Sequence, residues 1–331
     1  MKSKLIRLVS LPQGIPIATD FKIEEEELPP LKTGQLLLKT LYISVDPYLR
    51  AKMAGGHKPP LYAGDVMYSR AVAEVIATAD SDFQVGNKVI AFLEWRDYLI
   101  QDGNSVQAFD PRDIPLSAYL GVFGSTGLSA YFALTEIGTP RPGKALVVSG
   151  AAGAVGSIAG QIGKLMGCRV IGIAGTDEKV DFITSELGFD AAINYKSTGD
   201  MAEVIDRLCP DGVDIYFDNV GGAISDTVIS RMNDYGRVVV CGSITAYNVS
   251  GLSVGPRLLP LIVFKKLLVQ GFLISDYKDR YQEGISCLQQ WVGNGKLHYA
   301  ETILEGFERL PEAFIGLFTG RNEGKMIVSM V

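Results

Sequence analysis

The chain has 331 residues, which is too long for one ordinary domain and fits about two of typical size. Hydrophobic residues make up 47% and charged residues 21%, a globular balance that excludes a disordered chain. The formal net charge of −6 disfavours contact with a nucleic-acid backbone, so no nucleic-acid partner is expected.

The first part of the chain predicts an antiparallel, barrel-like domain. Short apolar runs at Gln35–Tyr42, Ala71–Ala77 and Lys88–Phe92 are separated by Gly, Pro and Asp and indicate strands. The acidic run Glu24–Glu27 is interpreted as a solvated loop. Arg7 interrupts the apolar stretch at the N-terminus, so no signal peptide is predicted and a cytoplasmic location is expected.

From about Ser125 the pattern changes to strands that alternate with helices, which predicts parallel βαβ units in a doubly wound sheet. Residues after about 297 return to short strands, ending in Lys325–Val331, that could complete the first domain. The expected helices cover Gly127–Gly138, Ala154–Gly167, Asp177–Leu187, Asp200–Cys209 and Gly222–Met232. The expected strands cover Ala145–Ser149, Arg169–Ala174, Ala191–Asn194, Val213–Asp218, Arg237–Cys241 and Leu267–Leu273.

The most apolar segment, Leu258–Ile274, is a poor candidate for a membrane span because Pro260, Lys265, Lys266 and Gln270 interrupt it. It is interpreted as a core or interface segment, and no membrane partner is expected. The four cysteines lie far apart in sequence without a C-x-x-C pair, which favours buried free thiols over disulfides.

A phosphate-binding turn is predicted where the strand Ala145–Ser149 meets the next helix. The motif Ala151-x-Gly153-x-x-Gly156 is a variant of the dinucleotide fingerprint. Gly153 lets the backbone approach a pyrophosphate, and Gly156 lets the helix pack on the strand. The helix N-terminus presents free N–H groups and a positive dipole end to phosphate.

The end of the second parallel strand favours NADP over NAD. A carboxylate usually lies there in NAD-selective sites, but Arg169–Ala174 is followed by Gly175 and Thr176. The first acid, Asp177, begins a helix and is interpreted as its N-cap. Lys179 follows within the first turn and suits a 2′-phosphate, although it could also be a solvated helix charge.

No metal site is predicted. A catalytic zinc needs Cys, His or acidic ligands together, and the only histidines, His57 and His298, have no Cys or His partner at ligand spacing. His57 is interpreted as a surface-loop residue. Without a metal, a tyrosine hydroxyl could stabilise a developing enolate. Tyr247, which follows the fifth parallel strand, and Tyr48 in the first domain are the candidates among 14 tyrosines.

These segments together resemble the zinc-free medium-chain dehydrogenase/reductase family of leukotriene B4 12-hydroxydehydrogenase, 15-oxo-prostaglandin 13-reductase and NADP-dependent alkenal and enone reductases. The resemblance covers nearly the whole chain. The motifs that carry it include Ser44-Val-Asp-Pro-Tyr-Leu-Arg50, Gly153-Ala-Val-Gly-Ser157, Tyr216-Phe-Asp-Asn-Val-Gly-Gly222, Cys241-Gly-Ser-Ile244 and Asn322-Glu-Gly-Lys325.

The resemblance implies an α/β fold in two domains. Residues 1–125 and 298–331 would form a GroES-like β-barrel-type catalytic domain, and residues 126–297 a Rossmann domain that binds NADP(H). It also implies a homodimer joined through the edges of the Rossmann sheets, a role that the apolar segment Leu258–Ile274 fits.

The resemblance further implies the site residues. Tyr247 would hydrogen-bond the substrate carbonyl, and Tyr48 would form a wall of the substrate pocket. Ser125 and Thr126 stand where the family usually has Met-Pro beside the nicotinamide, a change that bears on substrate preference rather than on the cofactor. The implied cofactor contacts are Ser125, Thr126, Gly153, Ala154, Val155, Gly156, Lys179, Tyr195, Asn219, Cys241, Gly242, Ser243, Ile244, Thr245, Ala246, Phe272, Leu273, Ile274 and Asn322.

The function expected from sequence is reduction of the carbon–carbon double bond of small α,β-unsaturated aldehydes or ketones by hydride transfer from NADPH. Two alternatives stay open at this point. One is a quinone reductase on the same scaffold, and the other is a catalytically silent NADP-binding redox sensor, because function lives in a site and not in a fold.

Overall fold

A computed structural model describes residues 1–56, 58–111, 113–249, 251 and 254–331 of the chain. Contacts within the chain divide it into two compact units, each described by itself below. Unit 1 comprises Met1–Gly121 and Glu301–Val331, and unit 2 comprises Val122–Ala300. Unit 1 is therefore built from both ends of the described sequence.

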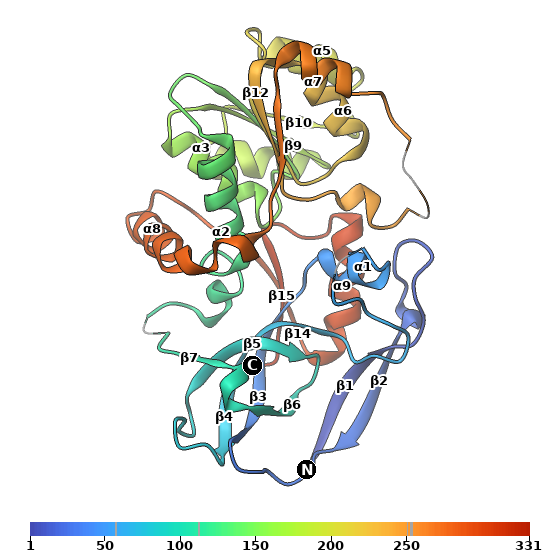
Figure 1. The fold of residues 1–331 in the computed structure, drawn as a ribbon, viewed down its shortest axis with the longest axis vertical. Helices are drawn as coiled ribbons and strands as arrows, with labels where there is room; N and C mark the ends of the chain where they lie inside the picture. The colour runs from blue at the N-terminus through green and yellow to red at the C-terminus, as the bar shows by residue number, and fades with distance from the viewer. Residues whose placement is uncertain (57, 112, 250, 252–253) are drawn as a thin grey trace. The chain divides into compact units, whose positions relative to one another are not determined.

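Unit 2 contains a parallel six-stranded sheet, of which β9, β10 and β12 are labelled in Figure 1. Its strand order is β10-β9-β8-β11-β12-β13. This is the order 3-2-1-4-5-6 of dinucleotide-binding folds, and it confirms the predicted doubly wound sheet. The chain reverses its direction of winding between β8 and β11. The strands are β8 (Ala145–Ser149), β9 (Arg169–Ala174), β10 (Ala191–Asn194), β11 (Val213–Asp218), β12 (Met232–Val240) and β13 (Leu268–Gly271).

Helices cover both faces of this sheet. Ile205 of α5, Val228 of α6 and Ile262 of α7 pack against one face, which includes Val147 of β8. Leu146, which points to the opposite face, lies under α3. The helices are α2 (Ser125–Phe132), α3 (Gly156–Leu165), α4 (Asp177–Asp181), α5 (Met201–Leu208), α6 (Gly222–Ser230), α7 (Leu259–Lys265) and α8 (Tyr281–Gly293), and π-helical turns follow α2 at Ala133–Gly138 and α4 at Phe182–Glu186.

Three glycines allow α3 to lie directly against the sheet and its connections. A Cβ on Gly156 would come within 2.4 Å of the Gly150 carbonyl oxygen. On Gly160 it would overlap the Phe189 ring at 1.8 Å, and on Gly163 it would meet a Leu146 methyl at 2.4 Å. A larger residue would therefore push the helix away from the strand that precedes it.

Unit 1 consists of a seven-stranded sheet and a two-stranded ribbon, β1–β2. The larger sheet follows the order β14-β15-β3-β4-β5-β7, with β6 also paired to β3. The strands are β1 (Lys2–Leu8), β2 (Phe21–Glu27), β3 (Gln35–Ser44), β4 (Tyr68–Thr78), β5 (Lys88–Glu94), β6 (Tyr98–Asp102), β7 (Gln107–Phe109), β14 (Glu301–Glu305) and β15 (Lys325–Ser329), and the helices are α1 (Tyr48–Met53) and α9 (Leu310–Thr319).

The pairs among β1–β7 are antiparallel, which confirms the expectation for the first part of the chain. Two other expectations about unit 1 were wrong. The last two strands, β14 and β15, are parallel and need a crossover. That crossover contains α9, a helix where only strands were expected; its Phe314 is buried among Phe21 and Trp95. Finally, the acidic run lies in β2, where Arg7 of β1 pairs with Glu24 and Glu26, so a strand and not a loop carries it.

The apolar segment Leu258–Ile274 forms α7 and β13. Leu258, Leu261 and Leu267 join the core of unit 2, as one of the two interpretations of this segment required. No helix in the described part of the chain combines the length and the apolarity that a membrane crossing needs.

Candidate functional site

The carboxyl ends of β8 and β11 form the centre of the candidate site in unit 2. Ligands of open parallel sheets bind where neighbouring strands connect in opposite directions, which here is between these two strands. The turn after β8 contains Gly153, Ala154 and Val155, and the loop after β11 contains Asn219. The two loops touch, because a Cβ on Gly150 would lie 3.4 Å from the Asn219 Cβ.

The turn Gly150–Val155 leads into α3 without a side-chain cap. The N-cap residue is Val155, which offers no oxygen to the first-turn amides. The Ser157 amide donates to the Gly153 carbonyl at 3.0 Å, and the neighbouring first-turn N–H groups, which have no acceptor within the helix, can donate to an anion. Gly156 begins the helix at a position where a Cβ would collide with the turn. The geometry fits a bound pyrophosphate, with Gly153, Ala154 and Val155 as the partly exposed residues.

A basic and aromatic cluster lies at the carboxyl end of β9. The N-cap of α4 is Thr176, whose Oγ1 accepts a hydrogen bond from the Lys179 amide at 3.3 Å. The sequence interpretation of Asp177 as the cap was therefore wrong. Asp177 is the first helical residue, and its carboxylate accepts a 2.7 Å hydrogen bond from the Asn194 side chain. The Asp177 carboxylate is thus already hydrogen-bonded to a side chain of unit 2.

Lys196 joins this cluster, although sequence reasoning did not select it. A Cβ on Gly175 would approach the Tyr195 ring at 3.1 Å and the Lys196 Cε at 3.4 Å. The Lys196 Nζ lies 5.9 Å from the centroid of the Tyr195 ring. The pairing of an aromatic residue with an adjacent lysine after a strand was the signal that could have identified it.

Asp218 connects the loops at the centre of the sheet. It is 4% exposed, and its carboxylate accepts a 2.9 Å hydrogen bond from the Ser149 hydroxyl at the end of β8. The Ser149 Oγ in turn accepts from the Asn219 amide at 2.9 Å, and the Asn219 side chain donates to the Ser149 carbonyl at 2.7 Å. Sequence reasoning placed Asn219 at the site but missed the two residues that hold it.

The loop after β12 packs on the loop after β11. The Thr245 hydroxyl and amide both donate to the Val220 carbonyl, at 2.7 and 3.1 Å. Gly221 has a φ of +74°, and a Cβ there would lie 2.3 Å from the Ser243 Oγ. The loop Cys241–Ala246, whose residues were all predicted as cofactor contacts, therefore lies beside Asn219, which was predicted as another.

The Tyr247 hydroxyl is a proton donor at neutral pH. Burial raises its pKa above the ordinary value of 10.0, and the nearby Cys241 adds to the rise, while a backbone hydrogen bond at Ser243 opposes it. Tyr247 follows a short helical turn, Ile244–Ala246, so its position depends on this loop. A neutral phenol in such a place can donate to a developing oxyanion.

The four thiols are held in the protonated form. Burial raises the pKa of Cys209 to about 11 and that of Cys241 to about 12. It also raises the pKa values of Cys168 and Cys287. Cys168 and Cys209 are buried free thiols, as predicted, whereas Cys241 and Cys287 are free but only half-buried.

The remaining predicted contacts of unit 2 flank this region. Phe272 continues from β13, is 8% exposed and stacks on Tyr277 at 5.3 Å between ring centroids. Leu273 is exposed and Ile274 is half-buried. Ser125 and Thr126 begin α2, which Gly127 permits, since a Cβ there would lie 1.8 Å from the Val122 carbonyl oxygen.

Two predicted residues belong to unit 1. Tyr48 begins α1, and the buried Lys52 one turn later lies 5.9 Å from its ring centroid and donates to the Tyr68 hydroxyl at 2.8 Å. Burial and the nearby Asp46 raise the pKa of Tyr48, so it stays neutral. Asn322 donates to the Gly324 carbonyl at 2.8 Å in the turn before β15. The structure thus places these two residues in a different unit from the other predicted contacts.

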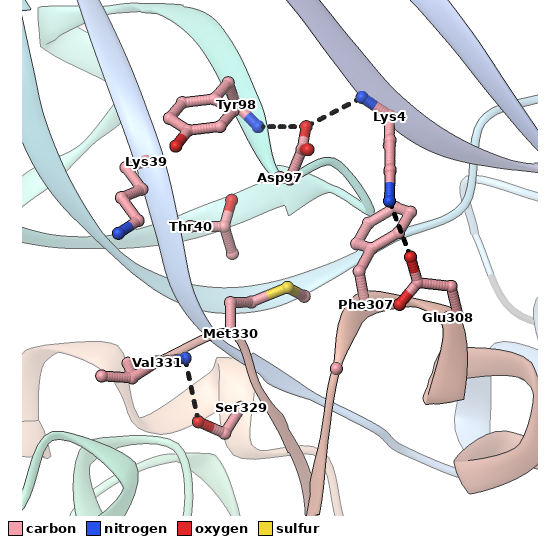
Figure 2. Close-up of a pocket in the computed structure, with 11 residues that line it drawn as sticks. Lys4, Lys39, Thr40, Asp97, Tyr98, Phe307, Glu308, Ser329, Met330 and Val331 are labelled. Carbon is pink, nitrogen blue, oxygen red and sulfur yellow. Dashed lines mark hydrogen bonds and ion pairs between the residues drawn. The ribbon is translucent and has the colours of Figure 1, made fainter.

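Unit 1 contains a cavity of about 430 Å³. Figure 2 shows side chains that line it, among them Lys4, Lys39, Asp97 and Glu308. None of the predicted site residues lines it. Its charges are largely engaged, because Lys4 pairs with Glu308 at 2.7 Å and its amide donates to Asp97 at 2.8 Å. We therefore assign the cavity no part in the site.

Among the described residues, no three His, Cys, Asp or Glu side chains gather in a way that could hold a metal ion. His298 hydrogen-bonds through its backbone to Gln161 of α3. His57, expected in a surface loop, lies outside the described residues.

Comparisons with known proteins extend this picture. Residues 4–109 match the family profile described as the N-terminal domain of oxidoreductase, and residues 154–290 match the profile described as zinc-binding dehydrogenase. Prostaglandin reductase 1 of Bos taurus is 44% identical over 320 residues, which are 95% of each chain. NADPH-dependent curcumin reductase of Escherichia coli is 40% identical over 328 residues, 97% of this chain and 95% of the relative.

Among solved structures, that of CurA from Vibrio vulnificus in complex with NADPH is 41% identical, with a TM-score of 0.93 over 99% of both chains. These similarities confirm the family resemblance seen in the sequence and the fold class that it implied. The chain belongs to the zinc-free oxidoreductases of the medium-chain dehydrogenase/reductase superfamily, in the family that contains prostaglandin reductase 1 and NADPH-dependent curcumin reductase.

Proposed function

We propose that this NADP-dependent oxidoreductase reduces the carbon–carbon double bond of small α,β-unsaturated aldehydes and ketones. The observation that carries the proposal is the neutral, half-buried Tyr247 at the carboxyl edge of the parallel sheet, on the loop that packs against Asn219. The relatives support it: curcumin, the compound in one relative's name, is a conjugated enone.

Unit 2 would hold NADPH along the carboxyl edge of its sheet. The first-turn amides of α3 fit the pyrophosphate, and Lys179, Tyr195 and Lys196 fit the 2′-phosphate. Asn219 and the loop Cys241–Ala246 would bind the nicotinamide half, with Ser125, Thr126 and Phe272–Ile274 beside it. Unit 1 would act as the catalytic domain and contribute Asn322 to the cofactor and Tyr48 to the substrate.

In this reaction NADPH supplies the hydride that adds to the β-carbon of the substrate. Negative charge then develops on the carbonyl oxygen, and the Tyr247 hydroxyl donates a hydrogen bond to it. Water or the Tyr247 hydroxyl then supplies the proton that converts the enolate to the saturated carbonyl compound. Because burial keeps that hydroxyl protonated, the donor is ready before charge develops. Tyr48, which is also neutral, would bound the substrate without adding charge.

A substrate panel tests the proposed function. We expect rapid NADPH oxidation with an alkenal and an alkenone, little with a saturated aldehyde, and less with NADH than with NADPH. Product analysis should show a saturated carbonyl compound, because the hydride adds to the β-carbon and not to the carbonyl carbon. A strong preference for quinones would favour a quinone reductase instead, and NADPH binding without turnover of any acceptor would favour a silent sensor.

Replacing either lysine near Gly175 should weaken the binding of NADPH but not that of NADH. We expect Lys179→Ala and Lys196→Ala each to raise the KM for NADPH about five- to tenfold, since each removes a charge-assisted hydrogen bond to the 2′-phosphate. The KM for NADH, which lacks that phosphate, should not change. Lys164→Ala near the other end of α3, where the lysine pairs with Asp190 at 2.6 Å, serves as the control. Equal losses with both cofactors would contradict the assignment.

Tyr247→Phe should lower kcat by about a hundredfold or more while leaving the KM for NADPH nearly unchanged, because only the oxyanion donor is lost. Since burial raises the pKa of Tyr247 above its ordinary value, loss of its proton should not reduce wild-type turnover in the neutral pH range. Tyr235→Phe, at a residue that is 72% exposed, is the control. Unchanged rates across several enones would remove Tyr247 from the mechanism.

We also propose a homodimer that forms through the edge of the parallel sheet. All four residues of the edge strand β13 are exposed, and Val263 and Phe264 of the preceding helix are 70% and 77% exposed. Such a combination of open strand edge and apolar surface favours pairing between chains. The double variant Val263→Asp and Phe264→Asp should convert a dimer to a monomer in light scattering, whereas Val85→Asp in unit 1 should not. A monomeric wild-type protein at micromolar concentration would refute the dimer.

A further inference from the structure

Asp218 is a buried carboxylate whose charge is balanced without a cation. No lysine, arginine or histidine in the described ranges forms an ion pair with it, although it is only 4% exposed. A charge in this situation is stable only when hydrogen bonds satisfy both oxygens. Its oxygens accept from the Ser149 Oγ at 2.9 Å, the Tyr216 hydroxyl at 2.9 Å, the Val220 amide at 2.9 Å, the Gly221 amide at 3.0 Å and the Ser225 Oγ at 2.5 Å.

The bonds of Asp218 fix three separate loops. Through Ser149 the carboxylate reaches the strand that leads into the phosphate-binding turn, and through the two amides it shapes its own loop. Its backbone carbonyl accepts from the Cys241 and Gly242 amides at 2.8 and 3.0 Å, which holds the start of the loop after β12. One residue thus sets the relative positions of the segments that follow β8, β11 and β12.

We propose that Asp218 is a positioning residue for the nicotinamide half of the cofactor. The inference rests on the proposed binding of NADPH. The carboxylate accepts from the Ser149 Oγ, and that oxygen accepts from the Asn219 amide, so the charge orients Asn219 through one intermediate atom. The elements proposed for the 2′-phosphate end, at β9, α4 and β10, receive none of the hydrogen bonds described for Asp218. Loss of the charge should therefore affect the two ends of the cofactor unequally.

Asp214 provides a matched control in the same strand. It lies near the amino end of β11, the edge opposite the proposed site. Its carboxylate also joins neighbouring segments, since it accepts from the Ala145 amide at 2.9 Å, from Lys144 at 3.0 Å and from the Asn233 side chain at 3.1 Å. Both residues are aspartates of β11, but they form their hydrogen bonds at opposite edges of the sheet.

The test compares NADPH with 2′,5′-ADP, which carries the 2′-phosphate end alone, in binding measurements on Asp218→Asn and Asp214→Asn. We expect Asp218→Asn to weaken NADPH binding at least about tenfold, because the amide lacks the negative charge that strengthens all five hydrogen bonds and places an N–H against the Ser225 hydroxyl, which now donates to Oδ2. Its affinity for 2′,5′-ADP should stay within about twofold. Asp214→Asn should lower the Tm and leave both affinities within about twofold.

Equal weakening of both ligands by Asp218→Asn, or unchanged binding of NADPH, would overturn the proposal. If that variant does not fold, Ser149→Ala decides, since it removes the link to Asn219 and should show the same selective loss of NADPH. Equal or absent effects in a folded Ser149→Ala would then overturn the proposal. Failure of the wild-type protein to bind NADPH would instead refute the proposed function.

Discussion

The close approach of α3 to the sheet is the constraint on which the candidate site depends. Helix and strand can meet at this distance only because Gly156, Gly160 and Gly163 carry no side chain where the Gly150 carbonyl, Phe189 and Leu146 lie. The approach fixes the direction of the helix, and the direction of the helix fixes where its first-turn amides point. A shift of α3 by the width of a methyl group would move the anion site away from the ends of β8 and β11.

The electrostatics of unit 2 differ along the edge of its sheet. Near β9 lie two lysines, the half-buried Lys179 and the exposed Lys196 beside Tyr195, together with the exposed acids Asp177 and Glu178. At β11 the buried carboxylate of Asp218 accepts hydrogen bonds from neutral donors, and after β12 the side chains of Tyr247 and Cys241 are neutral. Lysines thus lie where a phosphate is proposed, and neutral donors lie where charge would develop during the reaction.

The sequence allowed most of unit 2 to be predicted, because strands buried on both faces appear as short continuous apolar runs bounded by turns. Four predicted strands, among them Ala145–Ser149 and Val213–Asp218, have the bounds found in the structure. The structure of unit 1 was harder to predict from sequence. Its helix α9 packs between strands far apart in sequence, and the apolar Phe314 fits a strand pattern equally well. The cap of α4 was misassigned because Thr176 and Asp177 are both good caps, and only the backbone geometry distinguishes them.

The site residues themselves stay predictions, and the three that were overlooked, Lys196, Ser149 and Asp218, share a physical reason. The importance of Lys196 depends on its distance to Gly175, and that of Ser149 and Asp218 on a hydrogen-bond network whose donors come from β8, β11, α6 and the loops after β11 and β12. Neither relation is encoded in local spacing. An acid at the end of a buried strand is nevertheless a pattern that indicates a polar network, since a carboxylate enters a core only with partners.

The protonated state of the thiols has a consequence for an enzyme of the proposed activity. Conjugated aldehydes and ketones are electrophiles that alkylate cysteine, and the attacking species is the thiolate. With the pKa of Cys241 at about 12 and that of Cys209 at about 11, almost none of either side chain is ionised at neutral pH. We therefore expect burial to slow the alkylation of Cys209 and Cys241 by the compounds that the enzyme would consume.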